Sequence, residues 1–248
     1  MGVFLALLNE HCGYAFIHIP KSAGKSVKAH LLQHTFSVPA RLGFATGAAI
    51  QAGMGYLATF EAIEPALPYL YGPGVPAALR RYCREHGLRT SAHLTAAELR
   101  AAVGAESFTR LFSFSFVRNP WDRCLSAYFY FRRKRYHALH RLASARDFPD
   151  FALELEQREG AFVGNQARWI FDAEQQPLVD FIGHVETLEQ DMAIVSERLA
   201  IPMPQLARQV NVSHERERDY RPYYTPAAVD TVRRMMSVDC QHLGYEFE

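Results

Sequence analysis

The feature that most constrains the fold of this chain is a short turn rich in lysine and serine. It lies between a predicted strand and a predicted helix. Residues 14–19 read Tyr-Ala-Phe-Ile-His-Ile, a nearly continuous apolar run. Such a run predicts a strand buried on both faces, as in parallel sheets. Pro20 ends the run, and the spacing of residues 24–32 predicts a helix. We therefore expect a strand, a tight turn and a helix within residues 14–32.

The rest of the chain repeats this alternation of strands and helices. Apolar runs at residues 111–117 and 179–183 predict two further strands, and residues 3–8 predict a buried strand or a helix start. Residues 79–86 are expected to be helical. Capping residues predict further helix starts at Thr95, Asn119, Thr187 and Thr225, the helix after Thr225 being the last. The alternation predicts a three-layer α/β fold with a mostly parallel central sheet.

The length of 248 residues suits one large domain whose core needs no disulfide or metal. Residues 43–76 are rich in glycine, alanine and proline and show no clear period. We expect a single domain over residues 1–248, with a variable insertion or lid at about residues 40–90.

The net charge of +1 hides an uneven distribution. Residues 1–140 carry 16 Lys and Arg against 7 Asp and Glu, whereas residues 141–248 carry 11 against 19. Three of the four lysines lie within residues 21–28. Basic groups gathered in this way favour an anionic ligand, while the near-neutral total disfavours nucleic acid. The basic run at residues 132–135 is typical of a solvated helix end, and contact with an anionic glycan or nucleic acid is the alternative.

Cysteine usage and hydropathy bear on the compartment. The four cysteines form no C-x-x-C pair, so we expect reduced thiols in a cytosolic protein. The apolar residues 1–8 lack a basic leader and a cleavage site, and no stretch reaches the ~20 apolar residues of a membrane span. We expect a cytoplasmic protein with no membrane span; the oligomeric state stays open.

The turn at residues 20–26, Pro-Lys-Ser-Ala-Gly-Lys-Ser, predicts an anion site. A helix N-terminus offers unpaired N–H donors and a positive dipole end, and Gly24 leaves the backbone open to a phosphate. The alternative is a solvated helix with lysines in its first turn, which the helix dipole disfavours. The last three residues also match the end of a nucleotide P-loop, but Ile19 stands where that motif needs glycine.

A second motif follows the predicted strand at residues 111–117. Residues 116–128 read Phe-Val-Arg-Asn-Pro-Trp-Asp-Arg-Cys-Leu-Ser-Ala-Tyr. Arg118 is expected at the carboxyl end of the strand, and Ser126 two turns into the next helix. A guanidinium and a hydroxyl in these positions can bind a second phosphate.

The two segments together resemble the carbohydrate-type sulfotransferases, relatives of the heparan and chondroitin enzymes, here in a bacterial-like soluble form. That family typically shows His-Ile-Pro-Lys-Thr-Ala-Gly-Thr-Ser, and residues 18–26 read His-Ile-Pro-Lys-Ser-Ala-Gly-Lys-Ser. It later shows Phe-Val-Arg-Asn-Pro-aromatic-x-Arg-x-x-Ser-x-Tyr, which residues 116–128 match. The weaker part of the likeness comprises Gln166, Trp169, 179–183, Glu186, Asn211, Ser213, Tyr223, Tyr224, Asp239 and 244–247. Only residues 40–90 or so lie outside it.

The resemblance implies a P-loop-like sulfotransferase fold, related to nucleotide kinases but without their magnesium machinery. It implies 3′-phosphoadenosine 5′-phosphosulfate (PAPS) as the sulfuryl donor, with no metal. The residues implied at the 5′-phosphosulfate are Lys21, Ser22, Ala23, Gly24, Lys25 and Ser26; those implied at the 3′-phosphate are Arg118 and Ser126. Lys21 is expected to offset charge on the leaving group. Lys25 stands where the family usually has threonine, either as a second cation at the site or pointing to solvent.

His93, in the segment Thr-Ser-Ala-His-Leu at residues 90–94, is our candidate for the general base that the acceptor hydroxyl needs. Its alternative is a surface loop histidine. We interpret His18 as a packed core residue, His214 as a weaker base or a nucleotide-loop residue, and Asp122 as a helix N-terminal acid.

The function expected is a PAPS-dependent O-sulfotransferase acting on a saccharide or glycoconjugate hydroxyl. A tyrosine, a lipid-linked sugar or a natural-product hydroxyl stays open as acceptor. The alternative functions are a small-molecule kinase of the P-loop type and a non-catalytic module of the same fold that binds a nucleotide or glycan.

Overall fold

The computed structural model describes residues 7–35, 77–86, 93–135, 137–158, 163–203 and 216–248. The chain divides into two compact units, which are considered separately. The first unit comprises Met1–Ile19, Ala23–Phe116 and Trp169–Leu206, and the second comprises Pro20–Ser22, Val117–Arg168 and Ala207–Glu248. The single domain with an insertion at about residues 40–90 stays a prediction. Within that range only residues 77–86 are described.

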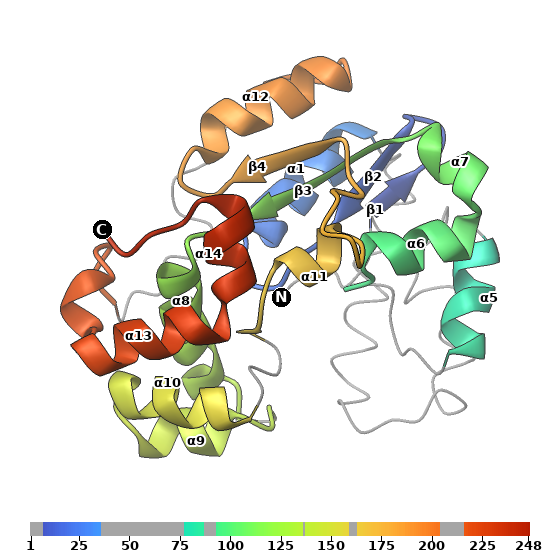
Figure 1. The fold of residues 1–248 in the computed structure, drawn as a ribbon. Helices are drawn as coiled ribbons and strands as arrows, with labels where there is room; N and C mark the ends of the chain where they lie inside the picture. The colour runs from blue at the N-terminus through green and yellow to red at the C-terminus, as the bar shows by residue number, and fades with distance from the viewer. Residues whose placement is uncertain (1–6, 36–76, 87–92, 136, 159–162, 204–215) are drawn as a thin grey trace. The chain divides into compact units, whose positions relative to one another are not determined.

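A four-stranded sheet forms the centre of the first unit (Figure 1). Its strands, in spatial order, are β1 (Leu7–Asn9), β2 (Tyr14–Ile17), β3 (Phe112–Val117) and β4 (Phe181–His184). β1 pairs with β2 antiparallel, and β2 pairs with β3 in parallel, with Phe16 opposite Phe114. The expected α/β class with a mostly parallel sheet is confirmed. The predicted strands at residues 14–19, 111–117 and 179–183 are β2, β3 and β4.

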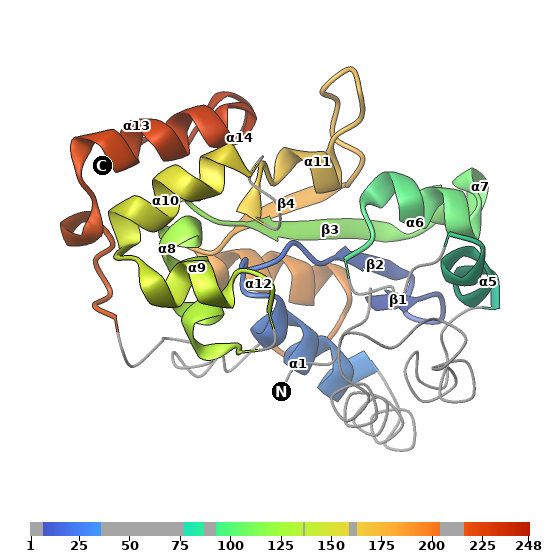
Figure 2. The ribbon, with the colours of Figure 1, turned by 90° about the horizontal axis from the view of Figure 1, so that it is seen from below.

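Helices cover both faces of this sheet, as Figure 2 shows. Helices α1 (Gly24–Thr35) and α12 (Leu188–Arg198) lie on one face, where Val27 and Met192 pack against Phe16 and Phe114. Helix α6 (Ala96–Val103) lies on the opposite face. The side chains of β2 are fully buried, as are Phe114, Phe116 and Val117 of β3, whereas Phe112 at the start of β3 is partly buried. This burial accounts for the apolar runs in the sequence. Within the described residues, this unit also contains α5 (Ala77–Glu85) and α7 (Ala105–Thr109).

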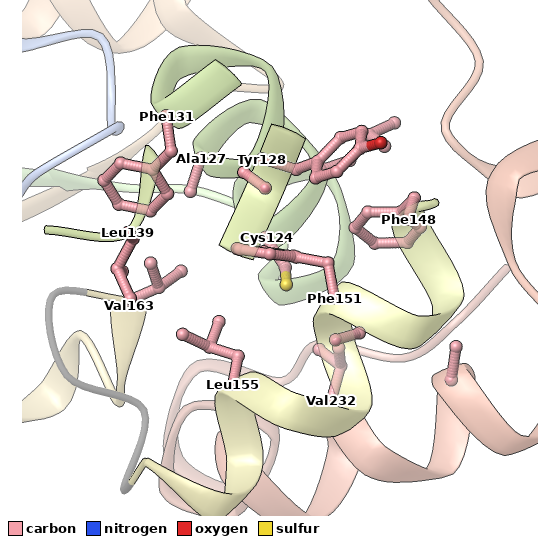
Figure 3. Packing of buried hydrophobic residues seen from close by; sticks show 14 of the residues in the cluster. Cys124, Ala127, Tyr128, Phe131, Leu139, Phe148, Phe151, Leu155, Val163 and Val232 are labelled. Carbon is pink, nitrogen blue, oxygen red and sulfur yellow. The ribbon is translucent and has the colours of Figure 1, made fainter. Parts of the chain in front are cut away.

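The second unit is built of helices around α8 (Pro120–Arg133). Figure 3 shows its core, in which Cys124, Tyr128 and Phe131 of α8 meet Phe151 and Val232. The part of this unit that the structure describes also contains α9 (His140–Ala145), α10 (Phe148–Gln157), η3 (Arg221–Tyr223), α13 (Pro226–Met235) and α14 (Ser237–Leu243). The short helix α11 (Ala167–Ile170) contains the point where the chain leaves this unit.

Most of the predicted caps form. Thr95 and Glu98 make both bonds of a capping box at α6, and the Asn119 side chain accepts from two backbone N–H groups at the start of α8. Thr225 caps α13 through its side chain.

Two helix predictions need correction. The Thr187 side chain makes no capping bond at α12, because the Thr187 backbone (φ −116°, ψ 29°) lacks the extended conformation that directs an N-cap hydroxyl to the first N–H groups of the helix. The hydroxyl donates to Asp191 Oδ2 at 2.8 Å. The helix that follows Thr225 is also not the last, because α14 continues the chain after α13.

Candidate functional site

The segment that joins β2 to α1 has an unusual backbone. Lys21 and Ala23 adopt positive φ angles of 69° and 53°, while Pro20 and Ser22 do not. Each left-handed residue other than glycine costs about 1–3 kcal/mol, and such residues gather at functional sites. Alternation of hand turns successive N–H groups toward one side, as in anion-binding nests. The dihedral angles therefore agree with the anion site that residues 20–26 predict.

Gly24 makes room for an imidazole ring in the first unit. A Cβ atom at Gly24 would lie 1.9 Å from both Cδ2 and Nε2 of His18. This packing is a second reason for glycine at this position, and the approach of a phosphate to its backbone stays a prediction. The first turn of α1 that follows has Ser26 buried and Lys25 exposed.

His93, in the segment that precedes α6, lies beside His18. The two ring centroids are 4.6 Å apart, and His93 Nδ1 lies 3.1 Å from the His18 carbonyl oxygen. A carbonyl oxygen only accepts hydrogen bonds, so Nδ1 carries the proton and the neutral ring has its lone pair on Nε2. Burial, with the nearby charge of Lys28, lowers the pKa of His93 to about 4. The ring is therefore neutral at pH 7 and can accept a proton.

Lys28 is a buried lysine near His93 that sequence reasoning did not single out. Its side chain is only 4% exposed, one helical turn beyond Gly24 in α1. Burial lowers its pKa to about 7. The clustering of three lysines within residues 21–28 was the available signal. His214, the weaker base candidate, lies outside the described residues.

Arg118 is held at the end of β3 by several hydrogen bonds in the second unit. Its Nε and Nη2 bind Asp122 Oδ2 at 2.7 Å and 2.6 Å, and its Nη1 donates to the Lys21 carbonyl oxygen at 3.2 Å. Its backbone N–H and carbonyl both bind the Gln166 side-chain amide. The two residues predicted at opposite ends of the donor nucleotide, Lys21 and Arg118, are thus in contact.

Helix α8 presents one partly exposed stripe. From Pro120 to Phe131 every residue is buried except Asp122, Ser126 and Tyr130. These three are spaced by four residues, so they lie along one side of the helix over about 12 Å. We call them the α8 stripe.

The α8 stripe carries predicted site residues along its length. Asp122 binds Arg118 at one end, Ser126 lies in the middle, and Lys21 Nζ lies 4.6 Å from the Tyr130 ring centroid at the other end. Tyr130 was not predicted, and its spacing from Ser126 was the only signal for it. The stripe therefore joins residues predicted for the 3′-phosphate to the lysine predicted for the 5′ side.

A buried polar network fixes residues 20–22 within the second unit. Arg123 Nε donates to the Pro20 carbonyl oxygen at 2.9 Å, and the Ser22 hydroxyl donates to Gln166 Oε1 at 2.9 Å. Gln166 in turn donates to Asp239 through its side chain and its backbone N–H. Ser22 is 1% exposed, so its hydroxyl anchors the turn and is not an open donor. A ligand contact at Ser22 is left to its backbone.

Asp122 is the helix N-terminal acid that the sequence predicts, and it also binds two arginines. It stands in the first turn of α8, and its carboxylate also receives a second guanidinium, from Arg216, at 2.6 Å. Arg216 was missed because it lies 94 residues away in an alternating run of charges that carries no motif.

Further features bear on cofactor and location. The four cysteines are free thiols. Among the described residues, no group of three or more His, Cys, Asp or Glu side chains is arranged to hold a metal ion. Within the same part of the chain, no helix is long and apolar enough to cross a membrane.

The fold is α/β, and the turn after β2 has a backbone that suits the predicted anion site. Comparison with known families gives the class of the protein. The sequence model of the Sulfotransferase family matches residues 6–246. The chain therefore belongs to the sulfotransferase family, whose reaction is sulfuryl transfer.

A relative from Archaeoglobus fulgidus, named "Uncharacterized protein", is 32% identical over 115 residues. The aligned part is 42% of this chain and 80% of that relative. No solved structure matches the chain at a significant level.

Proposed function

We propose that this sulfotransferase transfers a sulfuryl group from PAPS to a hydroxyl of a saccharide or glycoconjugate acceptor. The observation that carries the proposal is the α8 stripe. It has Arg118, bound to Asp122, at one end and Lys21, over Tyr130, at the other. PAPS carries a 3′-phosphate and a 5′-phosphosulfate on one nucleoside, so two separated cationic positions match its charges.

In this proposal, residues 21–26 hold the 5′-phosphosulfate, and Arg118 with Ser126 holds the 3′-phosphate. The alternating hand of the backbone at residues 20–23 supports an anion at the first position. The bonds from Arg118 to Asp122 and to the Lys21 carbonyl support the second, because they orient the guanidinium before a ligand arrives.

His93 is the proposed general base. The acceptor oxygen attacks sulfur, the bond from sulfur to the 5′-phosphate oxygen breaks, and adenosine 3′,5′-bisphosphate leaves. The acceptor proton passes to His93 Nε2, the nitrogen that the bond from Nδ1 to the His18 carbonyl leaves with a lone pair. Lys21 stabilises the negative charge that develops on the leaving oxygen. These protein groups supply each proton and charge that the step requires.

Transfer of radiolabelled sulfate from PAPS to a panel of acceptors tests the proposal. The panel contains saccharides, a tyrosine peptide, a lipid-linked sugar and phenolic natural products. We expect labelled product with a saccharide, and a rate lowered roughly 100-fold or more by His93→Gln or Lys21→Met. Arg110→Ala is the matched control, because Arg110 is exposed and its side chain binds Glu106 and Ser107 in the preceding turn.

Each outcome separates the candidate functions. Transfer that His93→Gln leaves unchanged removes His93 from the mechanism. Binding of adenosine 3′,5′-bisphosphate without transfer to any acceptor in the panel favours a non-catalytic nucleotide-binding module. Labelled product on tyrosine or lipid-linked sugar alone replaces the saccharide as acceptor.

A further inference from the structure

Arg216 is a buried arginine of the second unit to which the proposed function gives no role. Its side chain is 8% exposed, and its Nη2 donates to Asp122 Oδ1 at 2.6 Å. Its Nη1 is buried and has no hydrogen-bond acceptor among the residues that the structure describes. A buried donor without an acceptor destabilises a protein, and such groups often mark the place of a missing ligand.

Asp122 brings Arg216 and Arg118 together. One carboxylate oxygen accepts from Arg216, while the other accepts from Nε and Nη2 of Arg118. Two guanidiniums thus share one carboxylate, which leaves a local charge of +1. The Arg118 and Asp122 side chains are 15% and 18% exposed, so water screens this charge only in part. A second anion beside the pair would offset the surplus charge.

The surroundings of the pair match a phosphate. Ser126 lies one turn beyond Asp122 on the α8 stripe and offers a hydroxyl on the same side of the helix. Guanidiniums present N–H groups in a planar fork that fits phosphate oxygens. The carboxylate holds both forks in position in the absence of a ligand, so little ordering is needed when a phosphate binds.

We propose that Arg216 supplies the second guanidinium for the 3′-phosphate of the donor nucleotide and is a specificity-determining residue for that group. The inference rests on the proposed function. It assigns to Arg216 the preference for adenosine nucleotides that carry a 3′-phosphate over those that lack one. A nucleotide without this group leaves Nη1 of Arg216 without an acceptor and the surplus charge without a counterion.

Calorimetric titration with adenosine 3′,5′-bisphosphate and with adenosine 5′-monophosphate tests this inference. We expect Arg216→Ala to weaken binding of the bisphosphate roughly 10- to 100-fold and to leave the monophosphate unchanged. Arg221→Ala is the matched control, because Arg221 lies in the same segment and forms an exposed ion pair with Asp219 at 2.8 Å. It should leave the affinities for both ligands unchanged.

A second variant, Arg216→Gln, distinguishes a loss of phosphate binding from a loss of folding. Arg216→Gln can still donate a hydrogen bond to Asp122 but has no charge and no fork. It should reduce the preference for the bisphosphate as Arg216→Ala does, with a thermal unfolding midpoint close to that of the wild type. An unchanged preference in Arg216→Gln, or an equal loss for both nucleotides, overturns the inference.

The wild-type titrations separate this inference from the proposed function. A wild-type protein that shows no preference for the bisphosphate contradicts the proposed function itself. A wild-type preference that survives in both Arg216 variants contradicts only the role of Arg216.

Discussion

The Arg118 guanidinium donates to the backbone carbonyl of Lys21 at 3.2 Å, across 97 positions of the sequence. The bond joins the two motifs by which the chain resembles carbohydrate-type sulfotransferases. The Lys21 side chain extends over the Tyr130 ring, while Asp122 Oδ2 accepts from Nε and Nη2 of the same guanidinium. The position of Lys21 in the turn after β2 is therefore coupled to that of Arg118 before α8. A substitution at one of these residues should shift the other.

The shared carboxylate of Asp122 should contribute measurably to stability. Asp122→Asn removes the negative charge between Arg118 and Arg216, two largely buried guanidiniums. We expect the free energy of unfolding to fall by about 2–4 kcal/mol in urea titrations. The matched control is Asp219→Asn, which breaks the exposed pair with Arg221 and should cost about 1 kcal/mol or less. An equal loss in the free energy of unfolding for the two variants would contradict the larger contribution that we assign to Asp122.

The contact between Gly24 and His18 predicts a coupled pair of substitutions. Gly24→Ala places a Cβ atom at 1.9 Å from the His18 ring, so the ring must move or the helix start must shift. We expect a loss of about 1–3 kcal/mol in the free energy of unfolding. His18→Ala removes the clash, so the double variant should be more stable than the sum of the single effects predicts. Additive effects in the four-protein cycle would contradict this contact.

Protonation of His93 should destabilise the fold in acid. Its pKa lies near 4 in the folded protein, below the ordinary value of 6.5, so the unfolded chain binds the proton more tightly. The contribution is complete above about pH 6.5 and is lost as the pH falls toward 4. The free energy of unfolding, from urea titrations between pH 7 and pH 4, should therefore fall further for the wild type than for His93→Gln, by roughly 2–3 kcal/mol in total. Parallel curves for the two proteins would rule out a buried, neutral His93.

Burial of Lys28 should make the stability of the fold depend on pH above pH 7. Burial holds its pKa near 7, whereas the unfolded chain keeps the ordinary value of 10.5. Between these values the unfolded state binds more protons, so stability rises with pH. We expect the free energy of unfolding of the wild type, minus that of Lys28→Met, to rise between pH 7 and pH 9. The slope is limited to about 1.4 kcal/mol per pH unit for one group. A flat difference would place the Lys28 ammonium in water.

Local signals in the sequence were sufficient for the elements that build the site. The apolar runs of β2 and β3 predict buried strands because both faces of those strands are covered, and Asn119 followed by Pro120 predicts the start of α8. The predicted cap at Thr187 failed because the backbone of Thr187 is not extended, with φ −116° and ψ 29°, so its hydroxyl is not directed to the first N–H groups of α12. The residue type at a helix start does not reveal this backbone conformation.

Contacts between side chains far apart in the sequence could not be predicted from the sequence. Ser22 meets Gln166 across 144 positions, and Asp122 meets Arg216 across 94. Neither pair has a spacing that a helix or a strand imposes. The motif predicted Ser22 as a ligand residue, whereas the structure gives its hydroxyl to the anchoring of the turn. Gly24 has a second structural reason that the sequence did not reveal, because the ring of His18 packs against it.

Calorimetric titration of the wild-type protein with adenosine 3′,5′-bisphosphate tests the central claim most directly. The titration is made in EDTA and compared with ATP in the presence of magnesium. The account predicts saturable binding of the bisphosphate without metal, at an affinity well above that for ATP, and loss of that preference in Arg118→Ala. Tighter binding of ATP with magnesium, or no binding of the bisphosphate, would contradict a PAPS-dependent sulfotransferase and favour a kinase-type nucleotide site.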